Sequence, residues 1–519
     1  MSRSLAIAFI CSLGFVAFTT GCKSDDENPP GNSAAGSTGG TDPTGGTGAT
    51  SGGGAGGESG ASGQGGGEGG AGGGGAGGAG GEGGAGGGQV GDGKSWTHLG
   101  YDQTNTYFNP GETKISVESA PTLVEKWVFP TAGTPHGGLS IAEGKVFAST
   151  LGGTYAIDLA TGEQVWHKPA IVADSTATYD NGAVYVHTQG SILYKLNAAD
   201  GETIWMSAKT YDIAGSDGTS SPTVGGGFVV VGHSAGTNEV GAEAAAKMSK
   251  GGVEAFDTET GERAWTYQTC EGQEDGAMTW STVSIDLEAG IVFAATGNNY
   301  TVEGANSDSI HAIELATGEL VWKTQVRAGD QWSFALMNSQ DTDFGANPIL
   351  ATIGDRKVVA NGDKGSAFWV LDRMTGEEIW SNEALSSAHS PANGGVLNNG
   401  AFDGHTFYLA SNQPPTATRL HALAADGGAA VWPAKDFPVI VWGMSSVANG
   451  VLAVPLNTEL VLFNAATGDE LKRFETGGTI AAGAPAIADG MIVVKSGMSY
   501  IFAFADATNN SEIHAYGLP

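Results

Sequence analysis

The chain has 519 residues, of which 55 are acidic and 23 basic, so its formal net charge at pH 7 is -32. This excess of negative charge argues against nucleic acid or an anionic lipid surface as the partner. The 86 glycines are distributed so unevenly that the whole length cannot form one folded unit.

Residues 1–22 predict an export signal, with Arg3 at its start and an apolar run at 5–18 that is too short to span a membrane. The Gly-Cys pair that ends it resembles the bacterial lipobox, in which the Cys receives lipid and becomes the first residue. We therefore expect lipid on Cys22, with ordinary secretion as the alternative. Lys23, in place of an Asp, favours the outer membrane of the cell envelope.

Residues 23–94 predict a disordered Gly-rich linker. About half of the residues from 31 to 93 are Gly, mixed with small and polar residues, and such a stretch cannot bury a core. The predicted folded domain is residues 95–519.

The cysteines of this domain exclude two features. Cys270 is the only thiol left once Cys11 is removed with the signal and Cys22 carries lipid, so no internal disulfide is expected. No C-x-x-C-H stretch occurs, so we expect no c-type haem in this chain.

Seven copies of one short pattern are the main signal of the fold. LATGEQVW at residues 159–166 returns as LATGELVW at 315–322, and five looser copies share its glycine. A Trp stands four residues after the glycine in six copies, and successive copies are 39 to 60 residues apart. The seven glycines are Gly162, Gly201, Gly261, Gly318, Gly376, Gly428 and Gly468.

Each copy predicts a β-hairpin, because an alternating apolar strand is followed by a polar turn and a glycine that tolerates positive φ. A second apolar pair precedes each hairpin, as in LSIAEGKVFAST at 139–150. Four strands per repeat predict an all-β fold, a β-propeller.

The chain ends set the expected number of blades. Residues 123–129 read as a last strand without the three before it, and residues 512–519 as a third strand without a fourth. Pairing the two would complete an eighth blade and remove the open sheet edge.

The pattern A-x-D-x-x-T-G-x-x-x-W resembles the tryptophan-docking repeat of eight-bladed quinoprotein propellers. Over residues 96–519 the chain resembles the PQQ-dependent alcohol dehydrogenases, most closely their polyvinyl alcohol dehydrogenase branch. The segments TWSTVSID, VFAATGNNY and NGDKGSAFWVLDRMTG support this resemblance. It implies PQQ on the propeller axis, stacked on an aromatic ring and chelating Ca²⁺ or a lanthanide, and a separate electron acceptor such as a cytochrome c.

The resemblance implies four cofactor- and metal-binding residues. Trp280 stands where the family stacks PQQ, and Lys364 where a cation bonds the quinone oxygens. Asn298 and Glu239 match metal ligands, with Glu243 as a competitor for the second position. The simpler alternatives are a blade-packing Trp, a turn Asn, and an exposed Lys and Glu.

Two departures from the family bear on activity. The vicinal Cys pair that covers the second face of PQQ in the family is missing, and Ser333 in RAGDQWSF takes the place of the catalytic aspartate. Because a serine is a poor general base near pH 7, Asp330 becomes the candidate catalytic residue.

Three functions remain open at this level. The first is an exported quinoprotein dehydrogenase that oxidises an alcohol or a hydroxylated polymer. The second is a non-catalytic propeller, a scaffold or binding lipoprotein related to the outer-membrane assembly factors. The third is a propeller that binds a glycan or another small ligand in its central funnel.

Overall fold

The computed structural model describes residues 92–211, 218–235, 249–333, 341–386, 394–398, 400–413, 417–498 and 508–519. All of these ranges belong to one compact unit, residues 80–519, and residues 1–79 lie outside them. The export signal, most of the linker and the lipidation site Cys22 thus remain predictions. No helix in the described ranges is long and apolar enough to cross a membrane.

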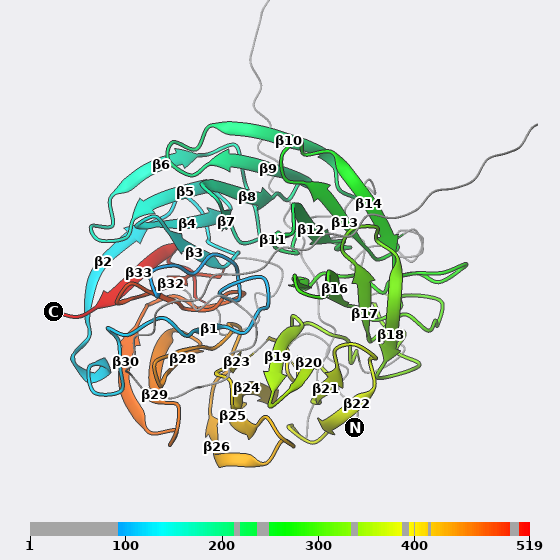
Figure 1. Cartoon of the computed structure of the whole chain (residues 1–519). Coiled ribbons are helices and arrows are strands. Elements are labelled where there is room, and N and C mark those ends of the chain that lie inside the picture. The colour runs from blue at the N-terminus through cyan, green and yellow to red at the C-terminus, as the bar shows by residue number, and fades with distance from the viewer. Residues whose placement is uncertain are drawn as a thin grey trace, which may run out of the picture. The chain divides into compact units, whose positions relative to one another are not determined.

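This unit is a ring of eight sheets, each built on four antiparallel strands, which confirms the predicted eight-bladed propeller (Figure 1). In blades 1 to 7 the first strand lies innermost and the fourth outermost. Blades 1 to 4 consist of β3 (Leu139–Ala142), β4 (Lys145–Thr150), β5 (Gly153–Asp158), β6 (Gln164–Lys168); β7 (Thr178–Asp180), β8 (Ala183–His187), β9 (Ile192–Asn197), β10 (Thr203–Lys209); β11 (Thr223–Gly225), β12 (Phe228–Gly232), β13 (Gly252–Asp257), β14 (Arg263–Gln268); and β15 (Ser284–Asp286), β16 (Ile291–Ala295), β17 (Ser309–Glu314), β18 (Leu320–Gln325).

Blades 5 to 7 repeat this order, and blade 8 closes the ring. They consist of β19 (Ile349–Ile353), β20 (Arg356–Gly362), β21 (Phe368–Asp372), β22 (Glu378–Asn382); β23 (Ala401–Phe402), β24 (Thr406–Gln413), β25 (Ala417–Ala424), β26 (Ala430–Phe437); β27 (Ser446–Ala448), β28 (Val451–Leu456), β29 (Glu459–Asn464), β30 (Glu470–Glu475); and β31 (Ala486–Ala488), β32 (Met491–Ser496), β33 (Glu512–Gly517) with β2 (Val124–Pro130). The 3-10 helix η1 (Ala120–Thr122) precedes β2. As predicted, β2 pairs antiparallel with β33 and supplies the fourth strand of blade 8.

The repeated octamer forms the turn between the third and fourth strands of a blade. In blade 1, Asp158 Oδ1 accepts hydrogen bonds from the backbone amides of Ala160 and Thr161 and from the Thr161 hydroxyl. Gly162 then takes a φ of +74°, which a residue with a Cβ adopts only at a cost.

The tryptophan of each copy joins its blade to the next. Trp166 Nε1 donates to Ala198 O at 3.1 Å, and its ring lies so close to Gly201 that a Cβ there would be 2.9 Å from Trp166 Cδ2. The glycine and the tryptophan therefore depend on each other across the interface. Six further interfaces repeat the bond: Trp127 to Leu159 O, Trp205 to Thr258 O, Trp265 to Leu315 O, Trp322 to Arg373 O, Trp380 to Ala425 O and Trp432 to Ala465 O, at 2.8–3.2 Å.

The seventh copy ends in Lys472 instead of Trp, and the closure of the ring explains this difference. Blade 8 takes its fourth strand from the N-terminal part of the chain, so β33 is not followed by a turn with a docking glycine. Lys472 Nζ instead donates to Pro121 O at 3.3 Å, within η1.

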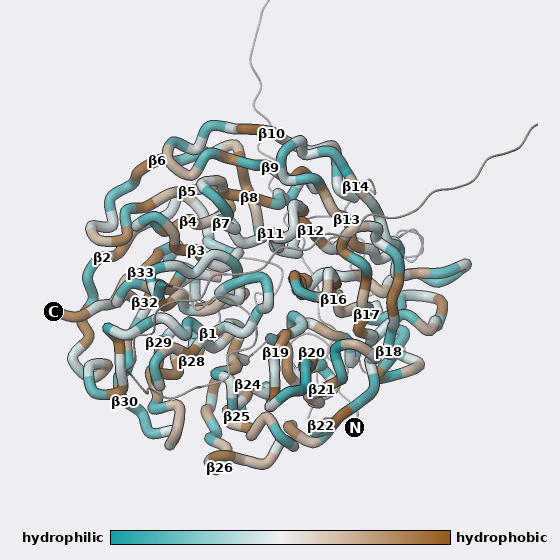
Figure 2. Tube along the Cα trace, in the orientation of Figure 1, coloured by the Kyte–Doolittle hydropathy of each residue, from teal (hydrophilic) through white to brown (hydrophobic). Residues whose placement is uncertain are grey.

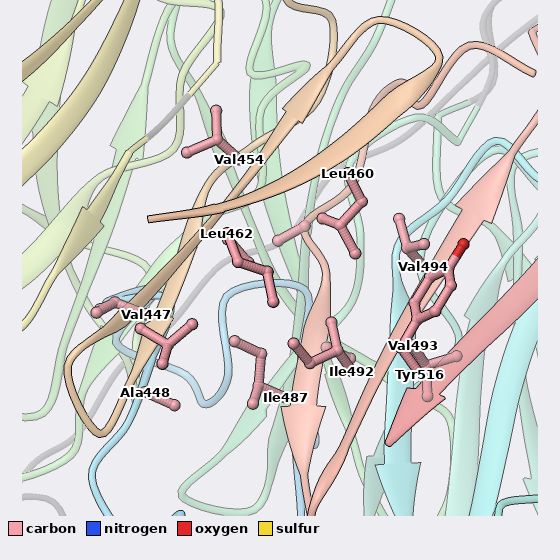
Figure 3. Packing of buried hydrophobic residues seen from close by; sticks show 14 of the residues in the cluster. Val447, Ala448, Val454, Leu460, Leu462, Ile487, Ile492, Val493, Val494 and Tyr516 are labelled. Atoms are coloured by element: carbon pink, nitrogen blue, oxygen red, sulfur yellow. The ribbon is translucent and has the colours of Figure 1, made fainter. Parts of the chain in front are cut away.

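The largest apolar cluster lies where the ring closes. Buried side chains of blades 7 and 8 interdigitate there, among them Leu462, Ile487 and Ile492 (Figure 3). Hydrophobic residues run along many of the strands (Figure 2), and second strands such as β8, β16 and β28 are buried over their whole length. Both faces of a blade therefore pack against its neighbours.

A single segment, residues 96–109, contacts the first strand of every blade; we call it the hub segment. It ends in β1 (Phe108–Asn109), which pairs parallel with β27 inside the ring (Figure 1). Its contacts follow the blades in order: Trp96 N to Ile141 O, Tyr179 N to Thr97 O, Val224 N to His98 Nε2, Ile285 N to Gln103 O, Leu350 N to Thr104 O, Phe402 N to Thr106 O, Val447 N to Tyr107 O, and Asn109 Nδ2 to Ile487 O. The hub segment thus satisfies backbone groups that the innermost strands would otherwise leave unpaired.

Candidate functional site

The predicted site residues lie in loops at one end of the propeller. Because the strands of a blade are antiparallel, loops that enter a blade and loops between its second and third strands emerge at the same end. Trp280 and Asp330 stand in loops that enter blades 4 and 5, and Asn298 and Lys364 stand in second-to-third-strand loops of those blades. Glu239 and its competitor Glu243 lie outside the described residues.

Trp280 and Lys364 share one carboxylate. Asp343 Oδ2 accepts a hydrogen bond from Trp280 Nε1 at 3.2 Å, and Asp343 Oδ1 lies 2.7 Å from Lys364 Nζ. The Lys364 ammonium lies 5.7 Å from the centre of the Trp280 ring. Asp341 Oδ1 pairs with the same ammonium at 2.7 Å.

This geometry decides between the two interpretations of Lys364, a residue of the site or an exposed lysine. Its side chain is only 8% exposed and carries two ion pairs, so it is not an exposed lysine in a turn. The stretch DTDFG at residues 341–345 supplies both partners. Asp341 and Asp343 are buried, and they neutralise a cation from the next loop.

Trp280 differs from the docking tryptophans of the repeat. Its ring is partly buried against Tyr211, Met278 and Tyr300, and none of its described contacts joins it to a repeat turn. Two glycines give the indole room: a Cβ at Gly345 would lie 2.8 Å from Trp280 Cη2, and one at Gly297 would lie 3.3 Å from Trp280 Nε1.

Asn298 is held between two loops. Its Nδ2 donates to Asn299 O at 2.9 Å and to Trp332 O at 2.5 Å, so both amide hydrogens are used. The loop that contains Asp330 runs alongside, because Asn299 N donates to Asp330 O at 3.1 Å and Trp332 N to Asn299 O at 2.9 Å.

Asp330 is buried, and one of its oxygens accepts two donors from a single residue. Thr342 N and Thr342 Oγ1 lie 2.5 and 3.1 Å from Asp330 Oδ2. Ser333, in the same loop, is buried as well. Four of the five predicted residues, Trp280, Asn298, Asp330 and Lys364, are therefore linked through the loops of blades 4 and 5.

The structure adds a residue that the sequence did not single out. Asp308, immediately before β17, is 1% exposed, and Thr342 Oγ1 lies 3.2 Å from its Oδ1. Burial, followed by the charges of Asp330 and Asp343, raises the pKa of Asp308 well above its ordinary value. The backbone of Asp308 has a φ of +49°, a left-handed conformation that residues other than glycine rarely adopt and that occurs often at functional sites.

The residues present fit a flat, anionic cofactor with a bound cation in part. Trp280 offers an aromatic ring beside a buried ammonium, and the cluster carries more carboxylates than cations, which a metal ion would balance. Within the described ranges, however, no three His, Cys, Asp or Glu side chains are arranged to hold a metal ion. A metal site there would need Asn298 and a residue such as Glu239.

Two family models match the chain. The model of the glucose/ethanol/alcohol dehydrogenase β-propeller domain matches residues 212–398. This stretch contains Trp280, Asn298, Asp308, Asp330, Asp341, Asp343 and Lys364. The model of the outer membrane protein assembly factor BamB matches residues 122–268 and 416–512. Together with the eight blades, these matches make the chain similar to the β-propellers of the PQQ, or quinoprotein, dehydrogenases.

Its relatives include polyvinylalcohol dehydrogenases. One from Pseudomonas sp. is 26% identical over 472 residues, covering 78% of this chain and 73% of the relative. The quinohemoprotein alcohol dehydrogenase of Comamonas testosteroni has a similar solved fold, with a TM-score of 0.67, 20% identity, and coverage of 82% of this chain and 80% of that one. A europium-containing methanol dehydrogenase is similar in fold, with a TM-score of 0.67 and 18% identity over 82% of this chain and 98% of that one.

Proposed function

We propose that this chain is an exported PQQ-dependent dehydrogenase that oxidises an alcohol group, on a small alcohol or on a hydroxylated polymer. The observation that carries the proposal is the linked set of Trp280, Asp343 and Lys364, within a chain whose relatives include polyvinylalcohol dehydrogenases. PQQ, with Ca²⁺ or a lanthanide, would supply a quinone that accepts hydride from the alcohol carbon.

Each candidate residue has a role in this proposal. Trp280 would support the cofactor ring, and Lys364 would donate hydrogen bonds to the quinone oxygens. Asn298 and Glu239 would bind the metal. Asp330 replaces the aspartate missing at Ser333 and accepts the hydroxyl proton of the substrate. Electrons would leave to a separate acceptor such as a cytochrome c.

The test is reconstitution. Purified protein is incubated with PQQ and Ca²⁺ or a lanthanide, freed of excess cofactor, and assayed with a redox dye on small alcohols and polyvinyl alcohol. We expect micromolar PQQ to be retained and to quench tryptophan fluorescence. W280A should abolish retention, whereas W205F, at a partly exposed docking tryptophan, should preserve it.

The role of Asp330 as the base is tested separately, by the turnover of the loaded enzyme. D330N should retain PQQ but lower the turnover of the loaded enzyme by about 10²–10⁴-fold, the usual contribution of a general base. A chain that retains no PQQ under any metal condition would overturn the dehydrogenase.

That outcome would favour the second candidate, a non-catalytic scaffold or binding propeller. Ser333 in place of the catalytic aspartate favours it, as does a Lys364 ammonium already shared by two carboxylates. The match to the assembly-factor model is consistent with it.

We also propose that the protein is anchored in the outer membrane by lipid on Cys22. C22S should move the protein from the membrane fraction to the soluble fraction of the cell envelope. Retention of C22S in the membrane would contradict the anchor.

A further inference from the structure

Asp308 is a buried carboxyl group with an incomplete set of hydrogen bonds. Its Oδ2 is buried and, among the described residues, has no hydrogen-bond partner. The charges that face it are negative, those of Asp330 and Asp343, while the Lys364 ammonium is paired with Asp341 and Asp343. An ionised carboxylate in this position would be desolvated without compensation.

Thr342 joins Asp308 to Asp330 and permits a count of protons. Its Oγ1 lies 3.2 Å from Asp308 Oδ1 and 3.1 Å from Asp330 Oδ2. A hydroxyl group carries one proton and donates one hydrogen bond. If both carboxyl groups were ionised, one of the two contacts would have no hydrogen between its oxygens. A second proton must therefore reside on one of the carboxyl groups.

The backbone decides which carboxyl group carries it. Asp330 Oδ2 also accepts the Thr342 amide at 2.5 Å, so this oxygen has two donors, as an ionised carboxylate prefers. Asp308 Oδ2 has none in the described part of the chain.

We propose that Asp308 holds a proton in the resting protein and donates it to Thr342 Oγ1, which in turn donates its own hydrogen to an ionised Asp330. Asp308 and Thr342 are then positioning residues that keep Asp330 charged and oriented. The raised pKa of Asp308, caused first by burial and then by Asp330 and Asp343, agrees with this arrangement.

The consequence for catalysis rests on the proposed function. Asp330 would accept one proton from the substrate hydroxyl, so the pair would pass from one bound proton to two and then release one to water. The neutral state of Asp308 prevents two adjacent negative charges from competing for that proton. The resting protonation itself depends on neither cofactor nor activity.

Infrared spectroscopy of the unloaded protein tests the resting state. The wild type at pH 7 should show a neutral carboxyl C=O band that shifts in D₂O. D308N should lose this band and D330N should keep it. T342V, which removes the bridging hydroxyl at similar volume, should keep the band at higher frequency.

If the wild-type protein shows no neutral carboxyl band at pH 7, the proposal is overturned. This test does not depend on the folding of any variant. Persistence of the band in D308N, or its loss in D330N, overturns it as well. These results stand even if no PQQ binds, so the failure of this inference is distinguishable from the failure of the proposed function.

In the loaded enzyme, T342V supplies a readout that a purely structural role would not move. Asp330 loses a donor, so the acid limb of the pH dependence of kcat/KM should shift to higher pH by about one unit. T342S restores the hydroxyl and should restore the limb. An unmoved limb in T342V overturns the relay through Thr342.

Discussion

The rim and the hub of the propeller hold the same eight blades by opposite means. On the rim, formed by the outer strands, one tryptophan–glycine contact is repeated at seven interfaces. At the hub, residues 96–109 contact all eight inner strands in a single pass. Repetition distributes stability over many equal contacts, whereas the hub concentrates it in one segment.

The largest effect should come from removing the hub. A variant that begins at residue 111 should yield no cooperatively folded propeller, because every inner strand loses a partner. A variant that begins at residue 92 is the matched control and should unfold like the full chain. Circular dichroism and denaturant unfolding compare the two. Equal unfolding midpoints would remove the distinction between hub and rim.

A single rim contact should matter less but still strongly. W265A deletes a buried indole and its bond to Leu315 O, and should lower the free energy of unfolding by about 3–5 kcal/mol. Because Trp432 docks at a separate interface, W265A and W432A should add within about 0.5 kcal/mol. Denaturant unfolding of both single variants and the double variant tests this, and strong non-additivity would argue against independent interfaces.

His98 should make the hub sensitive to acid. Burial lowers the pKa of His98 to about 4, while its bond with the Val224 carbonyl acts in the opposite direction. Between about pH 4 and 6.5 the unfolded chain binds more protons, so stability falls as pH falls through this window. One such group contributes up to about 1.4 kcal/mol per pH unit. Burial likewise lowers the pKa of His187, His311 and His421 to about 4.

The measurement is the free energy of unfolding at several pH values between 4.5 and 6.5. H98N should show a shallower slope than the wild type, although it is less stable overall. H405N, at an exposed position, controls for the loss of an imidazole. An unchanged slope in H98N would show that His98 is not held neutral in the folded state.

The smallest effect is expected where the repeat itself fails. K472W restores the tryptophan of the pattern, but blade 8 has no repeat turn to receive it, so stability should change by less than about 0.5 kcal/mol. Thermal unfolding checks this. A gain comparable to the loss in W265A would mean that a docking surface exists there after all.

The resemblance guided the candidate site better than the local sequence did. It singled out Trp280 and Lys364, which the structure links through Asp343, but it gave no indication of Asp308 or Thr342. These residues stand beside ordinary strand and turn sequence, and their role arises only where two loops meet. Glu239 remains a prediction.

By itself, the sequence determined the number of blades, the turn of each repeat and the closure of the ring, because period, turn chemistry and strand alternation are local properties. Only the tertiary structure revealed the hub contacts, the reason why Lys472 takes the place of a tryptophan, and the ion pairs around Lys364. These depend on residues far apart in the chain, such as Asn109 and Ile487, 378 positions apart. Burial then sets their energies, since a polar group removed from water needs a partner that only the folded chain can supply.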